Sequence, residues 1–285
     1  MYKNLSLGAL GFRLTLQEAV EMAKIGGFQG IEINIIEIEE ILKSKQINEV
    51  KNLVEENGLK FGGWVLPAHF RGDLDTYRED LEKLPSHAEL AERLGCRRVF
   101  TWLLPYSDEL PFEENFKFHV DRLRPIAEIL GDHGCSFGLE FVGPRTSRIN
   151  HKYEFIYTMD GMLRLCDEIG TGNLGLLLDS WHWYTTYGTT GQVRKLKSEQ
   201  VVYVHINDAP SGIPIEEQID NVRCLPGETG VMDLVGFLRA LREIGYDGPV
   251  TPEPFSGKLK EMTVVEAVKL TGKHLDEVWE EAGIS

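Results

Sequence analysis

Four residues in the second half of the chain carry side chains that bind metals or transfer protons, and each lies at or near the end of a short apolar segment. Glu140 follows SFGL, Asp179 follows LGLLL, His205 lies within VVYVHIN and Glu253 follows PVTP. Singly, each has a structural explanation: ion pairs for the glutamates, a helix cap for Asp179 and a backbone-bonded core histidine for His205. The four side chains can act together in metal binding or proton transfer only if the fold brings them close to one another.

The segments that must position these side chains alternate between strand-like and helix-like patterns. Apolar runs of strand length occupy residues 4–10, 29–34, 60–66, 97–102, 136–141, 174–179, 201–207 and 249–253. Amphipathic segments typical of helices occupy residues 15–25, 37–57, 76–94, 112–133, 161–169, 190–198, 232–244 and 263–282. Eight such units in order predict an α/β fold, a single-domain (β/α)8 TIM barrel over residues 1–285. An open doubly wound sheet is the alternative, although LGALGF lacks the spacing of a dinucleotide-binding turn.

In a barrel of this kind the carboxyl ends of the strands surround one mouth. We therefore expect Glu140, Asp179, His205 and Glu253 to converge there. Clustered carboxylates repel one another unless a cation offsets them. Three carboxylates and one imidazole suit one divalent metal ion, Mn²⁺ first, with Mg²⁺, Co²⁺, Fe²⁺ and Zn²⁺ as alternatives. The long loop 208–230 after the seventh strand is expected to serve function, with Asp208 orienting it or supporting a ligand.

Charge and composition exclude several classes of partner. The chain has 30 Lys and Arg against 45 Asp and Glu, a formal net charge of −15, and no dense basic cluster, so we expect no nucleic acid partner. No apolar run reaches the length of a membrane span, so we expect no membrane partner. The four cysteines, at positions 96, 135, 166 and 224, are widely spaced, which predicts free thiols and a cytoplasmic location.

The motifs around the four strand ends resemble the xylose isomerase-like TIM-barrel superfamily, in its sugar phosphate isomerase/epimerase branch, and within it the 2-keto-myo-inositol isomerases. The resemblance rests on LEFVGP, LLLDSWHWY, VVYVHINDAP, RCLPGETGVMD and GYDGPVTPEPF. It implies that Glu140, Asp179, His205 and Glu253 bind one metal. It also implies a small polyol or keto-sugar substrate, proton transfer by Glu140 and Glu253 through an enediolate, and a homodimer or homotetramer.

Two positions depart from the ketose 3-epimerases of that superfamily. These usually carry a Glu and an Arg where this chain has Thr146 and Ser211, which argues against a simple ketose 3-epimerase. A lyase that dehydrates a keto-cyclitol or a dehydroshikimate-type compound remains an alternative, because an enediolate can also expel a leaving group. A DNA repair endonuclease, disfavoured by the acidic charge, and a sugar-binding subunit without activity are further alternatives.

Six further side chains are candidates for contacting the substrate. The resemblance assigns a substrate oxygen to His182. Arg223 could hold a hydroxyl, carboxylate or phosphate, with an ion pair as the alternative. An indole face packs well against sugar C–H groups, which singles out Trp102. The remaining candidates are Glu32 and His69 at the same mouth, with structural hydrogen bonding as the alternative, and Arg145 for anion contact, with surface solvation as the alternative.

Overall fold

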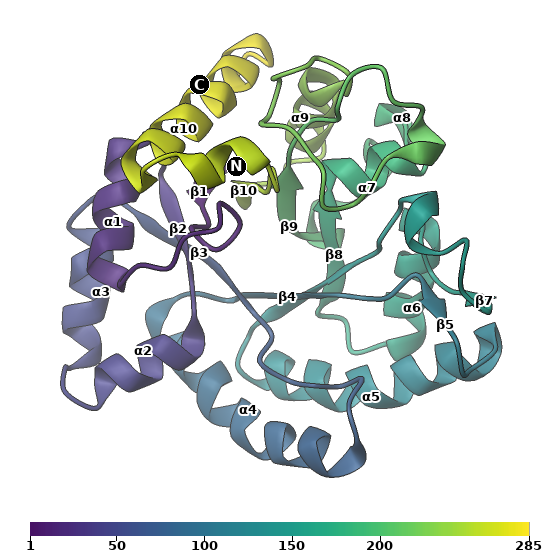
Figure 1. Ribbon diagram of the computed structural model, residues 1–285. Coiled ribbons are helices and arrows are strands. Elements are labelled where there is room, and N and C mark those ends of the chain that lie inside the picture. The colour runs from purple at the N-terminus through teal and green to yellow at the C-terminus, as the bar shows by residue number, and fades with distance from the viewer. Residues whose placement is uncertain (285) are drawn as a thin grey trace.

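Eight parallel strands close into a barrel in the computed structural model, which describes residues 1–284 (Figure 1). Strand β1 pairs with both β2 and β10, which closes the sheet on itself. The predicted α/β TIM barrel is therefore confirmed. The barrel strands, in chain order, are β1 (Tyr2–Leu5), β2 (Gly30–Ile33), β3 (Lys60–Val65), β4 (Arg98–Trp102), β6 (Ser136–Glu140), β8 (Leu174–Asp179), β9 (Val201–Ile206) and β10 (Pro249–Pro252).

The helices form a ring around the strands, and α1 and α10 lie side by side where the two ends of the chain meet (Figure 1). They are α1 (Leu16–Ile25), α2 (Ile35–Leu42), α3 (Ile47–Glu55), α4 (Leu74–Leu94), α5 (Phe112–Asp132), α6 (Met159–Ile169), α7 (Ser180–Thr185), α8 (Thr190–Val193), α9 (Leu234–Glu243) and α10 (Val264–Glu281). Short 3₁₀ turns lie at Arg145–Ser147, Ser198–Gln200, Ile215–Glu217 and Gly257–Glu261. Within residues 1–284, no helix has the length and apolar character needed to cross a membrane.

Three predicted elements have different limits in the structure. The first strand ends at Leu5 instead of residue 10, because the chain turns through Leu7–Gly11, where Gly11 has a φ of 88°. The helix predicted over 37–57 is two helices, because a second capping box formed by Gln46 and Glu49 starts α3. The helix predicted over 190–198 ends at Val193.

The barrel interior is filled by side chains from strands that are buried along most of their length. All six residues of β9 are buried, and the Tyr203 ring stacks on Phe100 with centroids 4.2 Å apart. Gly63 in β3 makes room for this ring, since a Cβ there would lie 2.8 Å from both the Arg98 carbonyl oxygen and Tyr203 Cε2. The four cysteines are free, as predicted.

Two loops beyond the carboxyl ends of the strands join to form a small sheet outside the barrel. Strand β5 (Tyr106–Ser107) in the loop after β4 pairs antiparallel with β7 (Tyr153–Glu154) in the loop after β6. Figure 1 shows this sheet beside α5 and α6, apart from the barrel strands. A third loop, 208–230, is held by Asp208, whose carboxylate accepts hydrogen bonds from the backbone of Thr229, Gly230 and Met232. Asp208 thus organises the loop, one of the two roles expected for it.

Candidate metal centre

The four predicted ligands converge at the carboxyl ends of adjacent strands. Glu140 ends β6, Asp179 ends β8, His205 lies in β9 and Glu253 follows β10. One ligand atom from each residue lies within 4.8 Å of the corresponding atom of every other. Glu140, Asp179 and His205 are buried, and Glu253 is half-buried. The predicted meeting of these four side chains is therefore what the structure shows.

The donor set fits a divalent cation because two of its buried atoms have no other partner. Glu140 Oε1 and His205 Nδ1 are both buried and form no hydrogen bond within the described chain. They lie 3.4 Å apart, and His205 Nδ1 is also 3.4 Å from Glu253 Oε2. Buried polar atoms are almost always paired in proteins. An ion between these atoms would satisfy both, and carboxylate oxygen with imidazole nitrogen suits Mn²⁺, Fe²⁺, Co²⁺ or Zn²⁺.

Asp179 uses its two oxygens for different purposes. Oδ1 accepts hydrogen bonds from the Trp181 backbone amide at 2.8 Å and from Asn207 Nδ2 at 3.0 Å. The first of these bonds caps α7, so Asp179 is both a helix cap and a member of the candidate metal cluster. Oδ2 accepts from Arg223 Nη1 at 2.8 Å, and one carboxylate oxygen of Asp179 lies within 4.8 Å of a ligand atom of each other residue of the cluster. The two interpretations of this residue are therefore compatible.

Arg223 lies in the middle of this acidic cluster and is 4% exposed. Its Nη1 donates to Asp179 Oδ2 and to Glu253 Oε2, both at 2.8 Å, and its Nη2 donates to Asp220 Oδ1 at 2.9 Å. The guanidinium also lies over the rings of Phe255 and Trp181. The structure thus shows the ion-pair alternative for Arg223, and it places the same side chain in the wall of the cavity described below.

Burial and mutual charge shift the pKa values of this cluster. Burial raises the pKa of Glu140 above its usual value. Burial alone would lower the pKa of His205, but the carboxylates of Glu253 and Glu140 outweigh it and raise that pKa well above the usual range. Burial would raise the pKa of Asp179, but the Arg223 guanidinium outweighs it and lowers that pKa. The protein is therefore arranged to hold positive charge at this point.

His182 is held so that one ring nitrogen faces the cluster. Its Nδ1 accepts a hydrogen bond from the Gly143 backbone amide at 3.2 Å, so the proton of the neutral ring is on Nε2. Nε2 lies 3.9 to 4.0 Å from carboxylate oxygens of Glu140, Asp179 and Asp220, beyond hydrogen-bond distance. Gly143 is required for this approach, since a Cβ there would lie 2.5 Å from the His182 carbonyl oxygen. This N–H is thus available to an incoming oxygen atom.

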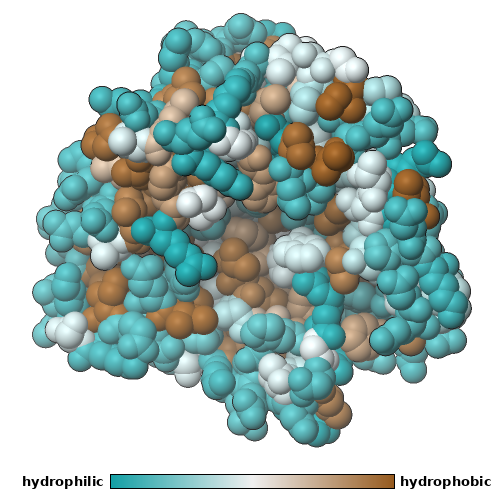
Figure 2. Space-filling view, viewed as in Figure 1, coloured by the Kyte–Doolittle hydropathy of each residue, from teal (hydrophilic) through white to brown (hydrophobic). Residues whose placement is uncertain are grey.

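A cavity of about 810 Å³ opens beside the cluster. The face seen in Figure 2 is hollowed at its centre, with hydrophobic residues inside and mostly hydrophilic ones around the rim. Aromatic and aliphatic side chains line the cavity together with charged ones, which suits a molecule with both C–H and hydroxyl surfaces. The lining comprises Trp102, Leu104, Pro105, Tyr106, Glu140, Val142, Thr146, Ser147, His151, His182, Ile219, Asp220, Asn221, Arg223, Glu253 and Phe255.

The structure brings three of the six predicted substrate contacts to this cavity: His182, Arg223 and Trp102, which is 44% exposed. His69 is outside the lining, with Nδ1 2.8 Å from Asp80 Oδ2. Arg145 is exposed and forms an ion pair with Glu216 at 3.4 Å. His69 thus forms a hydrogen bond of the structural kind given as its alternative, and Arg145 lies at the solvated surface, as its alternative states.

Glu32 belongs to a buried network beneath the cluster. It accepts hydrogen bonds from Ser6 Oγ at 2.9 Å and from the Tyr203 hydroxyl at 3.0 Å, and burial raises its pKa. The same hydroxyl accepts from Asn4 Nδ2 and Thr251 Oγ1. The Tyr203 ring meets His205 edge-on at 5.5 Å, so the network supports the histidine from below. Glu32 also lines a separate cavity of about 530 Å³ beside the ends of β1 to β3.

Three functional candidates were missed by sequence reasoning: Asp220, Asn207 and Tyr203. Tyr203 and His205 are two residues apart in β9 and so share the inward face, a signal that periodicity offered. Asn207 follows β9 and orients Asp179. Asp220 lies in the irregular loop 208–230, where no periodic pattern points to a side chain.

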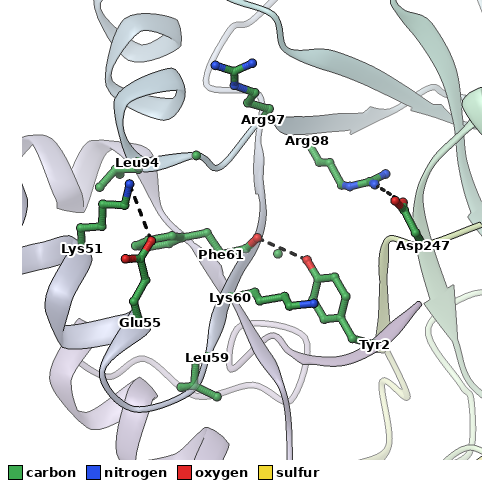
Figure 3. Close-up of a pocket in the computed structure, with 12 residues that line it drawn as sticks. Tyr2, Lys51, Glu55, Leu59, Lys60, Phe61, Leu94, Arg97, Arg98 and Asp247 are labelled. Carbon is green, nitrogen blue, oxygen red and sulfur yellow. Dashed lines mark hydrogen bonds and ion pairs between the residues drawn. The ribbon is translucent and has the colours of Figure 1, made fainter. Parts of the chain in front are cut away.

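The opposite end of the barrel has a cavity of about 440 Å³, shown in Figure 3. It lies at the amino ends of the strands, between Tyr2, Lys60, Arg98 and Asp247. Four of its charged side chains form ion pairs with one another: Arg98 pairs with Asp247 at 2.8 Å, and Lys51 with Glu55 at 3.7 Å. Active sites of TIM barrels lie at the carboxyl ends of the strands. None of the four candidate metal ligands lines this cavity.

Comparison with known proteins places this geometry in a family. The family model described as xylose isomerase-like TIM barrel matches residues 20–278. An inosose isomerase of Bacillus velezensis is 26% identical over 256 residues, which cover 89% of this chain and 88% of that protein. A 3-dehydroshikimate dehydratase of Pseudomonas putida is 26% identical over 253 residues, which cover 88% of this chain but 38% of the dehydratase.

Solved structures agree with the family match. A xylose isomerase domain protein from Alicyclobacillus acidocaldarius superposes with a TM-score of 0.88 at 29% identity, covering 99% of both chains. The IOLI protein, whose structure is described with a bound zinc atom, superposes with a TM-score of 0.81 at 23% identity, again covering 99% of both chains. The match over residues 20–278, on a barrel whose four strand ends form the cluster, shows that this chain belongs to the xylose isomerase-like TIM barrel family.

Proposed function

We propose that the protein is a divalent-metal-dependent isomerase or epimerase of a sugar, a sugar phosphate or a keto-cyclitol. The observation that carries the proposal is the pair Glu140 and Glu253, each with a carboxylate oxygen 3.4 Å from His205 Nδ1, in a buried cluster beside a cavity. Relatives named as inosose isomerases support the substrate class. Mn²⁺ is the ion we propose, and the IOLI neighbour, whose structure is described with a bound zinc atom, supports a divalent ion.

Different residues of the site have different roles in the proposed proton transfer. A divalent ion held by the cluster supplies Lewis-acid stabilisation of charge that develops on two adjacent substrate oxygens. One carboxylate, Glu140 or Glu253, removes the proton from the carbon that bears the hydroxyl. That C–H electron pair becomes the C=C bond of an enediolate. Return of a proton to the former carbonyl carbon, with transfer of the hydroxyl proton to the former carbonyl oxygen, moves the carbonyl by one position. His182 Nε2–H is placed to donate to a substrate oxygen.

Other side chains bind and shield the substrate in this proposal. Arg223 and Trp102 lie in the wall of the cavity and are proposed as contacts, Arg223 after exchange of one of its carboxylate partners. Glu32, His69 and Arg145 lie outside that lining and would need a larger substrate to be contacted. A cytoplasmic location, supported by four free cysteines, and a homodimer or homotetramer complete the proposal.

Hydrogen exchange tests the proposed reaction directly. The Mn²⁺-loaded protein, incubated in D₂O with a panel of inososes and ketoses, should incorporate deuterium at the carbon next to the carbonyl. Glu253→Gln should lower the exchange roughly 10²- to 10⁴-fold, with the metal content measured alongside. Glu92→Gln, at a half-buried acid paired with His133 and outside the cavity lining, is the matched control. Absence of exchange with every member of the panel would contradict the proposal.

A lyase acting on a keto-cyclitol or a dehydroshikimate-type compound is the second candidate. The 3-dehydroshikimate dehydratase relatives support it, although this chain spans 38% of their length. The same first proton transfer applies, after which the enediolate expels a hydroxyl as water and a conjugated carbonyl forms. Ultraviolet absorbance of that product separates the two reactions, because isomerisation leaves the mass and the conjugation unchanged.

A further inference from the structure

One histidine in the wall of the cavity is oriented by an acid, although neither residue belongs to the metal cluster. His151 lies in the loop after β6, and its Nδ1 is 2.9 Å from Asp108 Oδ2 in the loop after β4. The other carboxylate oxygen, Oδ1, accepts from the Lys152 backbone amide at 2.9 Å. Both bonds lower the pKa of Asp108, so the acid stays ionised and the Nδ1 proton of His151 stays directed at it.

The small outer sheet holds this pair in place. Strands β5 and β7 join the two loops, and the register sets Tyr106 opposite Glu154 and Ser107 opposite Tyr153. The Tyr106 ring stacks on the His151 ring at an interplanar angle of 9°. Two loops that leave different strands are therefore joined where a histidine and an acid 43 residues apart meet.

His151 has one ring nitrogen left for a ligand. With Nδ1 directed at Asp108, Nε2 is the free position, and it forms no hydrogen bond to another residue within the described chain, 1–284. The side chain is 28% exposed, and both His151 and Tyr106 line the cavity that also contains Glu140 and Arg223. A cavity of about 810 Å³ has room beyond the two oxygen atoms that a metal ion would hold.

We propose that His151, oriented by Asp108 and stacked on Tyr106, forms a distal subsite that binds a hydroxyl group at the end of the substrate away from the metal centre. This inference rests on the proposed function and narrows its substrate to a polyhydroxylated ring or chain with a hydroxyl at that end. Nε2 accepts from a hydroxyl when the imidazole is neutral and donates to one when it is charged, so a hydroxyl is recognised in either state. The Tyr106 ring offers an apolar face for adjacent C–H groups.

Steady-state kinetics of His151→Gln on the Mn²⁺-loaded protein test the subsite. We expect KM to rise about 3- to 10-fold, the equivalent of one hydrogen bond, with kcat and Mn²⁺ affinity changed less than twofold. Asp108→Asn keeps His151 but weakens the hydrogen bond that orients its ring, so KM should rise for this variant as well. His133→Gln is the matched control, because His133 also pairs through Nδ1 with an acid, Glu92, but lies outside the cavity lining. An unchanged KM, or a loss confined to kcat, would overturn the subsite.

A deoxy substrate identifies the group that is recognised. The wild-type protein should bind a deoxy-inosose lacking the distal hydroxyl about 3- to 10-fold more weakly than the parent compound, and His151→Gln should bind both equally. Retained discrimination in the variant would overturn the proposal.

Direct binding separates failure of the subsite from failure of the proposed reaction. If the wild-type protein turns over no member of the panel, calorimetric titration of the Mn²⁺-loaded proteins with myo-inositol gives the answer. Weaker binding by His151→Gln than by wild type supports the subsite, whereas equal binding, or binding by neither, overturns it.

Discussion

Arg223 and Asp179 form a buried ion pair in which Nη1 and Oδ2 are 2.8 Å apart. Asp179 is also one of the four candidate metal ligands, so a guanidinium and a metal ion would share one carboxylate. Nη1 also bonds Glu253, and Nη2 reaches Asp220 in the loop 208–230. Arg223 therefore brings positive charge to the cluster from that loop.

Arg223→Ala should destabilise the metal-free protein by roughly 3–5 kcal/mol, because it leaves buried carboxylates without compensation. Added Mn²⁺ should restore more stability to the variant than to wild type, since the ion replaces the lost charge. Thermal melts with and without Mn²⁺ measure both effects. Arg97→Ala, at an exposed arginine, is the control. If Mn²⁺ raised the melting temperatures of variant and wild type equally, Arg223 would not be what compensates the charge of the carboxylates.

Asp179→Ala and His182→Ala should separate metal binding from substrate binding. Asp179→Ala removes a ligand and should weaken Mn²⁺ binding roughly a hundredfold or more. His182→Ala should keep Mn²⁺ affinity and lower kcat/KM roughly 10²- to 10³-fold, because Nε2–H faces the developing charge. Calorimetric titration and steady-state assays measure the two quantities. Loss of metal in the His182 variant would mean that this ring acts on the ion itself.

Tyr203→Phe should cost roughly 1–3 kcal/mol of unfolding free energy, because its hydroxyl takes part in three buried hydrogen bonds, to Glu32, Asn4 and Thr251. Tyr246→Phe removes a hydroxyl with a single bond, to the Pro249 carbonyl, and should cost about 1 kcal/mol. Urea unfolding of the two variants compares them. If Tyr246→Phe were the more costly, the network would not carry the stability assigned to it.

His119 should make the protein sensitive to mild acid. Burial, with the nearby Arg71 adding to it, lowers the pKa of His119 to about 4, from 6.5 in a model peptide. The neutral ring is favoured in the fold, so this stability is present above pH 6.5 and is lost as the pH falls toward 4, by roughly 3 kcal/mol. His119→Phe should lack this part of the pH dependence. Urea titrations at pH 7, 5.5 and 4.5 should show the two stability curves converging or crossing as the pH falls, and parallel curves would contradict the assignment.

Sequence reasoning predicted the barrel and the metal cluster because both depend on local patterns. Each ligand ends a short apolar run, and parallel strands bring such ends to one mouth whatever the loops do. Helix starts with capping side chains were equally readable, as at Thr15 and Glu18. Where two helices followed each other without Gly or Pro between them, as at residues 43–46, periodicity alone merged them.

Contacts between loops could not be predicted in the same way. The pairing of Asp108 with His151, and of Arg223 with Asp179, joins residues more than 40 positions apart, and at least one member of each pair lies in a loop. Such contacts depend on the path of each loop, which follows from tertiary packing and not from a repeating pattern. For the same reason Asp220 was missed, and the surroundings of His69 and Arg145 became known only from the structure.

All four candidate ligands come from one half of the barrel, the consecutive neighbours β6, β8, β9 and β10. The strands β1 to β4 contribute none of them, yet the end of β4 supplies Trp102 and the loop after it supplies Tyr106 to the cavity wall. Part of the proposed recognition surface is thus encoded in a stretch of the gene that carries none of the candidate ligands, residues 98–107. Mutations in that stretch can change the preferred substrate while the candidate ligands stay the same. Such a separation makes the scaffold evolvable.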